Sequence, residues 1–226
     1  MLIHLVRSSL VFGLTIAVFA GAAYAATKSL IPAAKLDEPL ASAPGRRTAV
    51  LAGGCFWGTQ AVFERVKGVL DTTAGYAGGS ASTATYDRVI TETTGHAECA
   101  EVTYDPSKIT YGELLRIFFA VAHDPTQLNR QGHDVGTSYR SAIFYSGAEQ
   151  KRIAEAYIAQ LDAAKAFPRK IVTQVTLLKG FYPGEDYHQD YALKNPGDPY
   201  IEVCDLPKIA ALQEQFPELF VDYKGK

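Results

Sequence analysis

A cysteine stands where an apolar strand gives way to a helix, in the segment Gly53-Gly54-Cys55-Phe56-Trp57-Gly58. The apolar run 48–52 before it is typical of a buried strand, and the apolar spacing after it predicts a helix over residues 56–68. Cys55 then lies at a helix N-terminus, where free N–H groups and the helix dipole favour thiolate over thiol. The segment therefore predicts a reactive cysteine, with a buried structural cysteine at a tight turn as the alternative.

The N-terminal residues 1–25 have the pattern of a secretory signal peptide. Arg7 supplies a positive charge, residues 10–22 form an apolar stretch, and small residues end at Ala25. We expect cleavage after Ala25 and export, to a periplasm, with no membrane association of the mature chain. An uncleaved N-terminal membrane anchor is the alternative, although the apolar stretch is short for a spanning helix.

Residues 26–46 contain three prolines among alanines and mixed charges, which is typical of a flexible linker without its own core. Residues 47–226 have the size of one catalytic domain. The formal net charge is −2, and there is no basic run, so nothing points to nucleic acid. Three scattered cysteines do not make a disulfide scaffold, and the absence of CxxC and HExxH patterns argues against a metal site.

The order of predicted elements indicates an α+β fold. Thr110 and Glu113 form a capping box before an apolar helix, and Ser146 and Glu149 form another before a helix that runs to about Lys165. Residues 124–137 are rich in Gly, Pro and Asn and predict a long functional loop. We expect a mixed central sheet with flanking helices and a long C-terminal extension. The strands are expected at residues 48–52, 69–76, 96–104, 139–145 and 171–178, and a last helix at 210–216.

One acidic side chain interrupts an apolar strand face. Glu98 shares its face of the strand 96–104 with Ala100, Val102 and Tyr104. Burial among apolar groups raises a carboxyl pKa, which would suit Glu98 to act as a general acid near neutral pH. The alternative is a carboxylate at a strand end that faces solvent.

Several motifs resemble, in order and spacing, those of the A-type peptide methionine sulfoxide reductases. The resemblance covers residues 47–220 and implies a ferredoxin-like α/β sandwich. The family reduces methionine S-sulfoxide, free or in proteins, and so repairs oxidised proteins. The matching segments are the cysteine segment, Gly75-Tyr76-Ala77-Gly78-Gly79, Thr94-Gly95-His96-Ala97-Glu98, His123-Asp124-Pro125-Thr126, residues 134–141 and Tyr187-His188-Gln189-Asp190-Tyr191.

The resemblance also implies roles for individual residues. Cys55 is the nucleophile that attacks the sulfoxide sulfur and becomes a sulfenic acid, and Glu98 is the acid. Tyr86 and Tyr139 would donate hydrogen bonds to the sulfoxide oxygen; we expect Tyr139 to begin the strand 139–145. Asp134 would bind or orient the substrate. Phe56 and Trp57 would form an apolar cradle for the methyl group.

Recycling of the sulfenic acid needs a further thiol. The resemblance implies no bound cofactor and an external thiol reductant, a thioredoxin-like protein or a dithiol. Cys204 is the one cysteine in the C-terminal region and the candidate resolving residue, on a tail expected to be mobile that would have to swing toward Cys55. Pro199 and Pro207 flank it and would stiffen that tail, which counts against easy movement. It also remains open whether Cys99 is the resolving residue or whether there is none. Strand alternation places Cys99 on the face opposite Glu98. We expect a monomer.

Two other functions stay open at this point. A cysteine hydrolase or acyl transferase would pair Cys55 with His96, His123 or His188. A non-catalytic exported binding domain would use Phe56 and Trp57 as an exposed anchor, with an unreactive cysteine.

Overall fold

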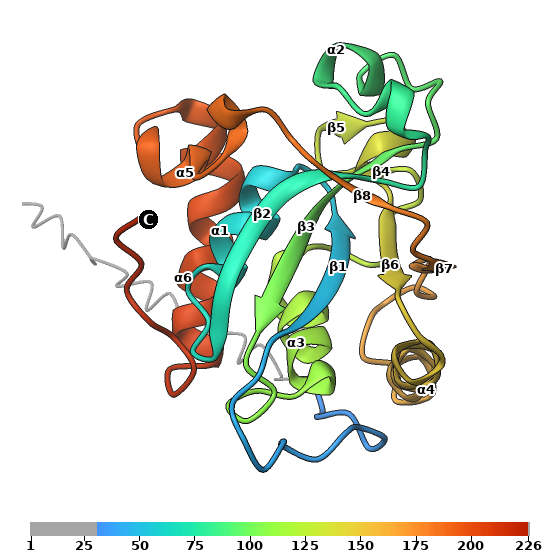
Figure 1. Cartoon of the computed structure of the whole chain (residues 1–226), viewed down its shortest axis with the longest axis vertical. Helices are drawn as coiled ribbons and strands as arrows, with labels where there is room; N and C mark the ends of the chain where they lie inside the picture. The colour runs from blue at the N-terminus through green and yellow to red at the C-terminus, as the bar shows by residue number, and fades with distance from the viewer. Residues whose placement is uncertain (1–30, 226) are drawn as a thin grey trace, which may run out of the picture.

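The computed structural model describes residues 31–225, and a six-stranded sheet forms its centre (Figure 1). The strand order is β7-β6-β1-β3-β2-β8, and a separate hairpin pairs β4 with β5. All neighbours in the sheet are antiparallel except β6 and β7. The predicted mixed sheet is confirmed. The strands are β1 (Arg47–Gly53), β2 (Val69–Ala77), β3 (Ala97–Tyr104), β4 (Arg130–Gln131), β5 (Asp134–Val135), β6 (Ser141–Tyr145), β7 (Gln174–Leu177) and β8 (Phe181–Pro183).

Strand direction brings four chain segments to one edge of the sheet. β1 and β2 end at this edge, whereas β3 and β6, antiparallel to β1, begin there. In Figure 1 it is the upper edge, beside α2 and the hairpin of β4 and β5. The chain segments that follow β1 and β2 and those that precede β3 and β6 therefore meet in one place.

The helices pack mainly on one face of the sheet. Leu51, Val102 and Ile143 point from three strands into the main core, where they meet helical residues such as Phe63 and Leu115. The α-helices are α1 (Phe56–Phe63), α2 (Tyr86–Val89), α3 (Tyr111–Ile117), α4 (Ala148–Ala163), α5 (Tyr191–Lys194) and α6 (Leu206–Gln215). Short helices are η1 (Ala81–Thr83), η2 (Phe118–Ala122), η3 (Thr137–Tyr139), η4 (Asp186–His188) and η5 (Ile201–Asp205).

The other face of the sheet carries a smaller core. Val50, Cys99 and Phe144 lie in it, with Leu178 and Phe181 packed against them. Cys99 is thus fully buried on the face opposite to its neighbour Ala100, as strand alternation predicts.

Some element boundaries differ from the sequence predictions. Tyr139 ends the 3₁₀ turn η3 instead of beginning a strand, because β6 starts only at Ser141, where pairing with β1 begins. Thr110 is the N-cap residue of α3 as predicted, since its hydroxyl accepts the Glu113 N–H at 3.2 Å, and the Glu113 carboxylate accepts a hydrogen bond from Arg116. Ser146 makes no such cap: Gly147 is the N-cap residue of α4, without a side-chain hydrogen bond.

Residues 31–46 contain no helix or strand, but they pack on the folded body. Ile31 belongs to the main core, and Asp37 accepts hydrogen bonds from the Thr110 hydroxyl and the Gly112 N–H at the start of α3. The folded unit therefore extends N-terminal to Arg47, the boundary that we expected for the domain.

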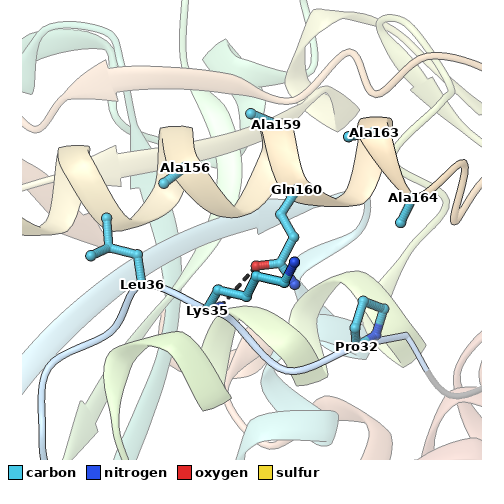
Figure 2. A pocket seen from close by; sticks show the side chains of 8 residues that line it. All are labelled: Pro32, Lys35, Leu36, Ala156, Ala159, Gln160, Ala163 and Ala164. Atoms are coloured by element: carbon cyan, nitrogen blue, oxygen red, sulfur yellow. Dashed lines mark hydrogen bonds between the residues drawn. The ribbon is translucent and has the colours of Figure 1, made fainter.

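A groove of about 680 Å³ separates residues 32–36 from α4 (Figure 2). Ala156, Ala159 and Ala163 line its helical wall, and the Gln160 side chain reaches across to accept the Lys35 N–H at 2.8 Å. None of the sequence-predicted functional residues lines this groove. Within residues 31–225, no helix is long and apolar enough to cross a membrane.

Candidate active site

A small pocket opens at the sheet edge where the four segments meet. Its volume is about 200 Å³, and every residue predicted for the chemistry and for substrate binding lines it, Cys204 alone excepted. Tyr200, which sequence reasoning missed, completes the wall. The lining residues are Cys55, Phe56, Trp57, Tyr86, Glu98, Asp134, Tyr139 and Tyr200.

Cys55 occupies the N-cap position of α1, two residues after β1 ends at Gly53, and the residue is 7% exposed. Burial raises the pKa of its thiol well above the ordinary value, and the carboxyls of Glu98 and Asp205 raise it further. The Trp57 backbone N–H and the Lys208 ammonium oppose them with smaller effects. The expected low thiol pKa is therefore wrong. Burial and carboxyls from distant parts of the sequence outweigh the helix N-terminus, and the resting residue carries its proton.

Glu98 lies beside Cys55 with its carboxyl turned toward the start of α1. The Phe56 backbone N–H donates to Glu98 Oε2 at 3.0 Å, and the side chain is 2% exposed. Burial raises the pKa of Glu98 to about 8, although the Phe56 N–H works in the opposite direction. The carboxyl is therefore mostly protonated at neutral pH. That is the state a general acid needs, and the prediction that burial raises this pKa is confirmed.

Tyr86 and Tyr139 reach the pocket from different segments. Tyr86 opens α2, and its backbone N–H donates to Glu185 Oε1 at 2.9 Å; Tyr139 closes η3. Burial, followed by the nearby Glu98 carboxyl, raises the pKa of both phenols. Both hydroxyls keep their protons at physiological pH and can donate to a substrate oxygen.

Asp134 and Tyr200 close the pocket on another side. The Tyr200 hydroxyl donates to Asp134 Oδ2 at 2.5 Å, so the carboxylate of β5 is tied to the start of the C-terminal segment. The sequence gives no signal for Tyr200, because one tyrosine among 13 has no distinguishing pattern.

Phe56 and Trp57, the aromatic side chains beside Cys55, are held in place by residues outside the pocket. Trp57 stacks on Tyr191 with ring centroids 3.8 Å apart and planes 9° from parallel. Its indole N–H donates to His188 Nδ1 at 3.1 Å. Phe56 is almost fully buried, with its ring 4.9 Å from the His188 ring. The two side chains form a rigid apolar surface, not an exposed anchor.

The three candidate histidines are engaged elsewhere. The His96 ring accepts the Gly79 N–H at 3.2 Å, and the His123 ring bonds to the Ser141 hydroxyl at 2.7 Å. His188 accepts the Trp57 indole N–H, as above. Within residues 31–225, none of these rings lines the Cys55 pocket, so no Cys–His pair is assembled for hydrolysis.

Cys204 lies outside the pocket, in the π-helical turn η5. Ile201 and Asp205 at the two ends of this turn are fully buried, and Asp205 pairs with Lys208 at 3.0 Å. Asp205 approaches α1 so closely that a Cβ at Gly58 would lie 2.1 Å from its carboxylate oxygen. The expected mobile tail is therefore packed against α1, and all three cysteines are free thiols. Within the described part of the chain, no group of three or more His, Cys, Asp or Glu side chains could hold a metal ion.

The comparisons with known proteins decide the family. Residues 47–219 match the family model described as peptide methionine sulfoxide reductase. The chain belongs to this family. A protein of Mesorhizobium japonicum named peptide methionine sulfoxide reductase MsrA 2 is 56% identical over 82% of this chain and 94% of the relative. Its namesake in Synechocystis is 51% identical over 83% of this chain and 87% of the relative.

Solved structures agree with the family. The reduced form of Mxr1 from Saccharomyces cerevisiae superposes with a TM-score of 0.61 at 35% identity, over 75% of this chain and 94% of Mxr1. Methionine sulfoxide reductase A of Corynebacterium diphtheriae gives 0.58 at 39% identity, over 69% and 77% of the two chains. These neighbours have the same α+β fold as this member of the family.

Proposed function

We propose that this protein reduces the S epimer of methionine sulfoxide to methionine, both free and in oxidised proteins. One observation carries the proposal: a single pocket brings together the Cys55 thiol, the protonated Glu98 carboxyl and two phenol hydroxyls. The pocket volume of about 200 Å³ lies below the roughly 300–1,000 Å³ of sites for drug-sized ligands. It suits a methyl sulfoxide group whose polypeptide stays outside.

The pocket supplies each group that the reduction requires. Glu98 protonates the sulfoxide oxygen while Tyr86 and Tyr139 donate hydrogen bonds to it, and Cys55 sulfur attacks the sulfoxide sulfur. This attack forms an S–S bond between Cys55 and the substrate. The S–O bond and the new S–S bond then break as the oxygen bonds to the Cys55 sulfur, which leaves a sulfenic acid on Cys55 and releases the methionine thioether. The thiol proton of Cys55 returns to Glu98, so the protons balance. The sulfoxide sulfur gains two electrons and the Cys55 sulfur loses two.

In this proposal, selectivity for one epimer comes from three directions around the sulfoxide sulfur. The oxygen faces Glu98 and the two tyrosines, the methyl group faces Phe56 and Trp57, and the attacking sulfur fixes the third direction. In the opposite epimer, the oxygen and an apolar substituent would exchange places, so the oxygen would face apolar side chains. Each epimer accordingly has its own class of enzyme.

Recycling in this proposal uses Cys204. Its thiol attacks the sulfur of the Cys55 sulfenic acid, a disulfide forms, and water leaves. A thioredoxin-like protein or a dithiol then reduces the disulfide. Because a disulfide needs Cα atoms within about 7 Å, this step requires Cys204, in the turn η5, to come within that distance of Cys55.

The test of the proposal is turnover of the separated sulfoxide epimers with a dithiol reductant. We expect methionine from the S epimer and none from the R epimer. Equal rates on both epimers, or acylation of Cys55 by an activated ester without sulfoxide reduction, would reject the proposal in favour of a less selective reductase or a hydrolase.

We further propose that the enzyme acts as a monomer after export to the periplasm. Support for the export comes from the sequence of residues 1–25, with Arg7, the apolar stretch and the small residues before Ala26. These residues lie outside the described part of the structure. N-terminal sequencing should find a mature chain that begins at Ala26; an intact Met1 on membrane-bound protein would favour the anchor.

A further inference from the structure

A strained acidic residue lies between two pocket residues along the chain. Glu92 follows Tyr86 by six positions and precedes Glu98 by six. Its backbone has a φ of +62°, in the left-handed region that residues other than glycine seldom adopt. Such strain persists only where the surroundings enforce it, and it occurs often at functional sites.

The Glu92 carboxylate reaches across to the turn that carries Tyr139. Oε2 accepts the Thr137 hydroxyl and the Ser138 N–H, both at 2.9 Å, and Oε1 accepts the Ser138 hydroxyl at 2.5 Å. The N-cap residue of this turn is Gly136, which has no side chain that could accept these hydrogen bonds. A Cβ at Gly136 would lie 2.3 Å from the Glu92 carboxylate, so glycine is needed there.

Charge strengthens these three hydrogen bonds. Burial raises the pKa of Glu92, but the bonds from Ser138 and Thr137 outweigh it and the net shift is downward. The group is therefore an anion at neutral pH, and hydrogen bonds to an anion are stronger than neutral ones. Arg140 braces the same two segments, through its contacts with the carbonyls of Gly95, His96 and Thr137.

We propose that Glu92 is a positioning residue that fastens the turn of Tyr139 to the segment between Tyr86 and Glu98. The Glu92 clamp, meaning Glu92 with Thr137 and Ser138, fixes the spacing of the two phenol hydroxyls around the sulfoxide oxygen. It touches no reacting atom. The inference rests on the proposed reductase function and adds to it a residue outside the pocket that sets transition-state geometry.

The test is the rate of methionine release from the S epimer in a single turnover, with enzyme in excess and no reductant. Glu92→Gly removes the clamp and relieves the backbone strain, so we expect an intact fold by circular dichroism and about a tenfold slower release. Lys165→Gly is the matched control. Lys165 also has a left-handed backbone, with φ of +50°, but it is exposed, follows the C-cap residue of α4 and does not line the pocket. It should release methionine at the wild-type rate.

Two further variants separate positioning from a structural role. Glu92→Gln keeps the shape but removes a negative charge near Glu98, whose pKa that charge raises. The basic limb of its pH–rate profile should therefore move to lower pH. Ser138→Ala should slow release by about twofold alone and by nothing further when added to Glu92→Gly, because both changes break the same contact.

The outcomes are distinct. Wild-type release with unchanged rates and pH profiles in the Glu92 variants would overturn the clamp and leave the reductase function intact. A wild-type enzyme that releases no methionine would overturn the proposed function and the clamp's catalytic role with it. Slower release in Glu92→Gly but not in Lys165→Gly supports the clamp.

Discussion

The edge of the sheet around Cys55 and the C-terminal segment around Cys204 differ in how they are built. Cys55 and Glu98 sit at the ends of paired strands, and the pocket around them is lined by side chains from separate segments of the chain. Cys204 sits in one π-helical turn that is held by its buried ends, Ile201 and Asp205. π-Helical turns are rare, less stable than α-helix and frequent at functional sites. In the proposed cycle, the site around Cys55 serves the chemical step, and the segment around Cys204 has to rearrange for recycling.

The largest effect should come from the nucleophile. Cys55→Ser replaces the soft sulfur by a hydroxyl that cannot accept the sulfoxide oxygen reversibly, so we expect no detectable methionine release. Cys99→Ala removes the other buried thiol, on the opposite sheet face, and should retain turnover. Turnover of Cys55→Ser at a tenth of the wild-type rate would show that the rigid site works without its cysteine.

The next effect concerns the acid. Glu98→Gln should slow methionine release by roughly a hundredfold, the typical worth of a general acid. The pKa of Glu98 is raised to about 8, so wild-type activity should fall as pH rises through about 8, where the carboxyl loses its proton. This fall in activity above about pH 8 should be absent in Glu98→Gln. Glu101→Gln, three residues along β3, is the control; an unchanged rate for Glu98→Gln would return Glu98 to a structural role.

A smaller effect is expected from one phenol. Tyr139→Phe removes a single donor to the sulfoxide oxygen while Tyr86 remains, which should slow release by about tenfold, since a hydrogen bond is worth roughly 1.4 kcal/mol. Tyr145→Phe, at the end of β6 and outside the pocket, should behave as wild type. Equal rates of methionine release for Tyr139→Phe and Tyr145→Phe would show that the Tyr139 ring contributes packing and its hydroxyl contributes nothing to the reaction.

The smallest effect on the first turnover should come from Cys204. Cys204 is partly buried and lies outside the pocket, so Cys204→Ser should release one methionine per enzyme within about twofold of the wild-type rate. It should then stall with thioredoxin-type donors, which act on a disulfide. Continued turnover of Cys204→Ser would mean that an external thiol reduces the sulfenic acid directly. The segment around Cys204 would then have no role in recycling.

Local patterns predicted the rigid region well and the C-terminal segment poorly. The strand that ends before Cys55 and the alternation around Glu98 follow from apolar periodicity, which sequence shows directly. The π-helical turn at Cys204 has no periodic signal, and Tyr200 enters the pocket only through its tertiary contact with Asp134. The direction of the Cys55 pKa shift was missed for the same reason. Burial is the largest cause, followed by the Glu98 and Asp205 carboxyls, and all three depend on tertiary packing that local pattern does not show.

The docking of residues 31–46 was also beyond local pattern. Prolines and mixed charges predict an irregular segment, and it is irregular, but its contacts are made through single side chains. Asp37 at the start of α3 and Ile31 in the core are examples. Neither belongs to a periodic run.

The most direct measurement locates the oxygen after one turnover. Cys204→Ser enzyme, mixed with an equal amount of the S epimer and no reductant, should release one methionine per chain. Mass spectrometry of its peptides should then find one added oxygen on Cys55, trapped as a sulfenic acid. Methionine release with an unmodified Cys55, or with the oxygen on Cys99, would contradict Cys55 as the nucleophile.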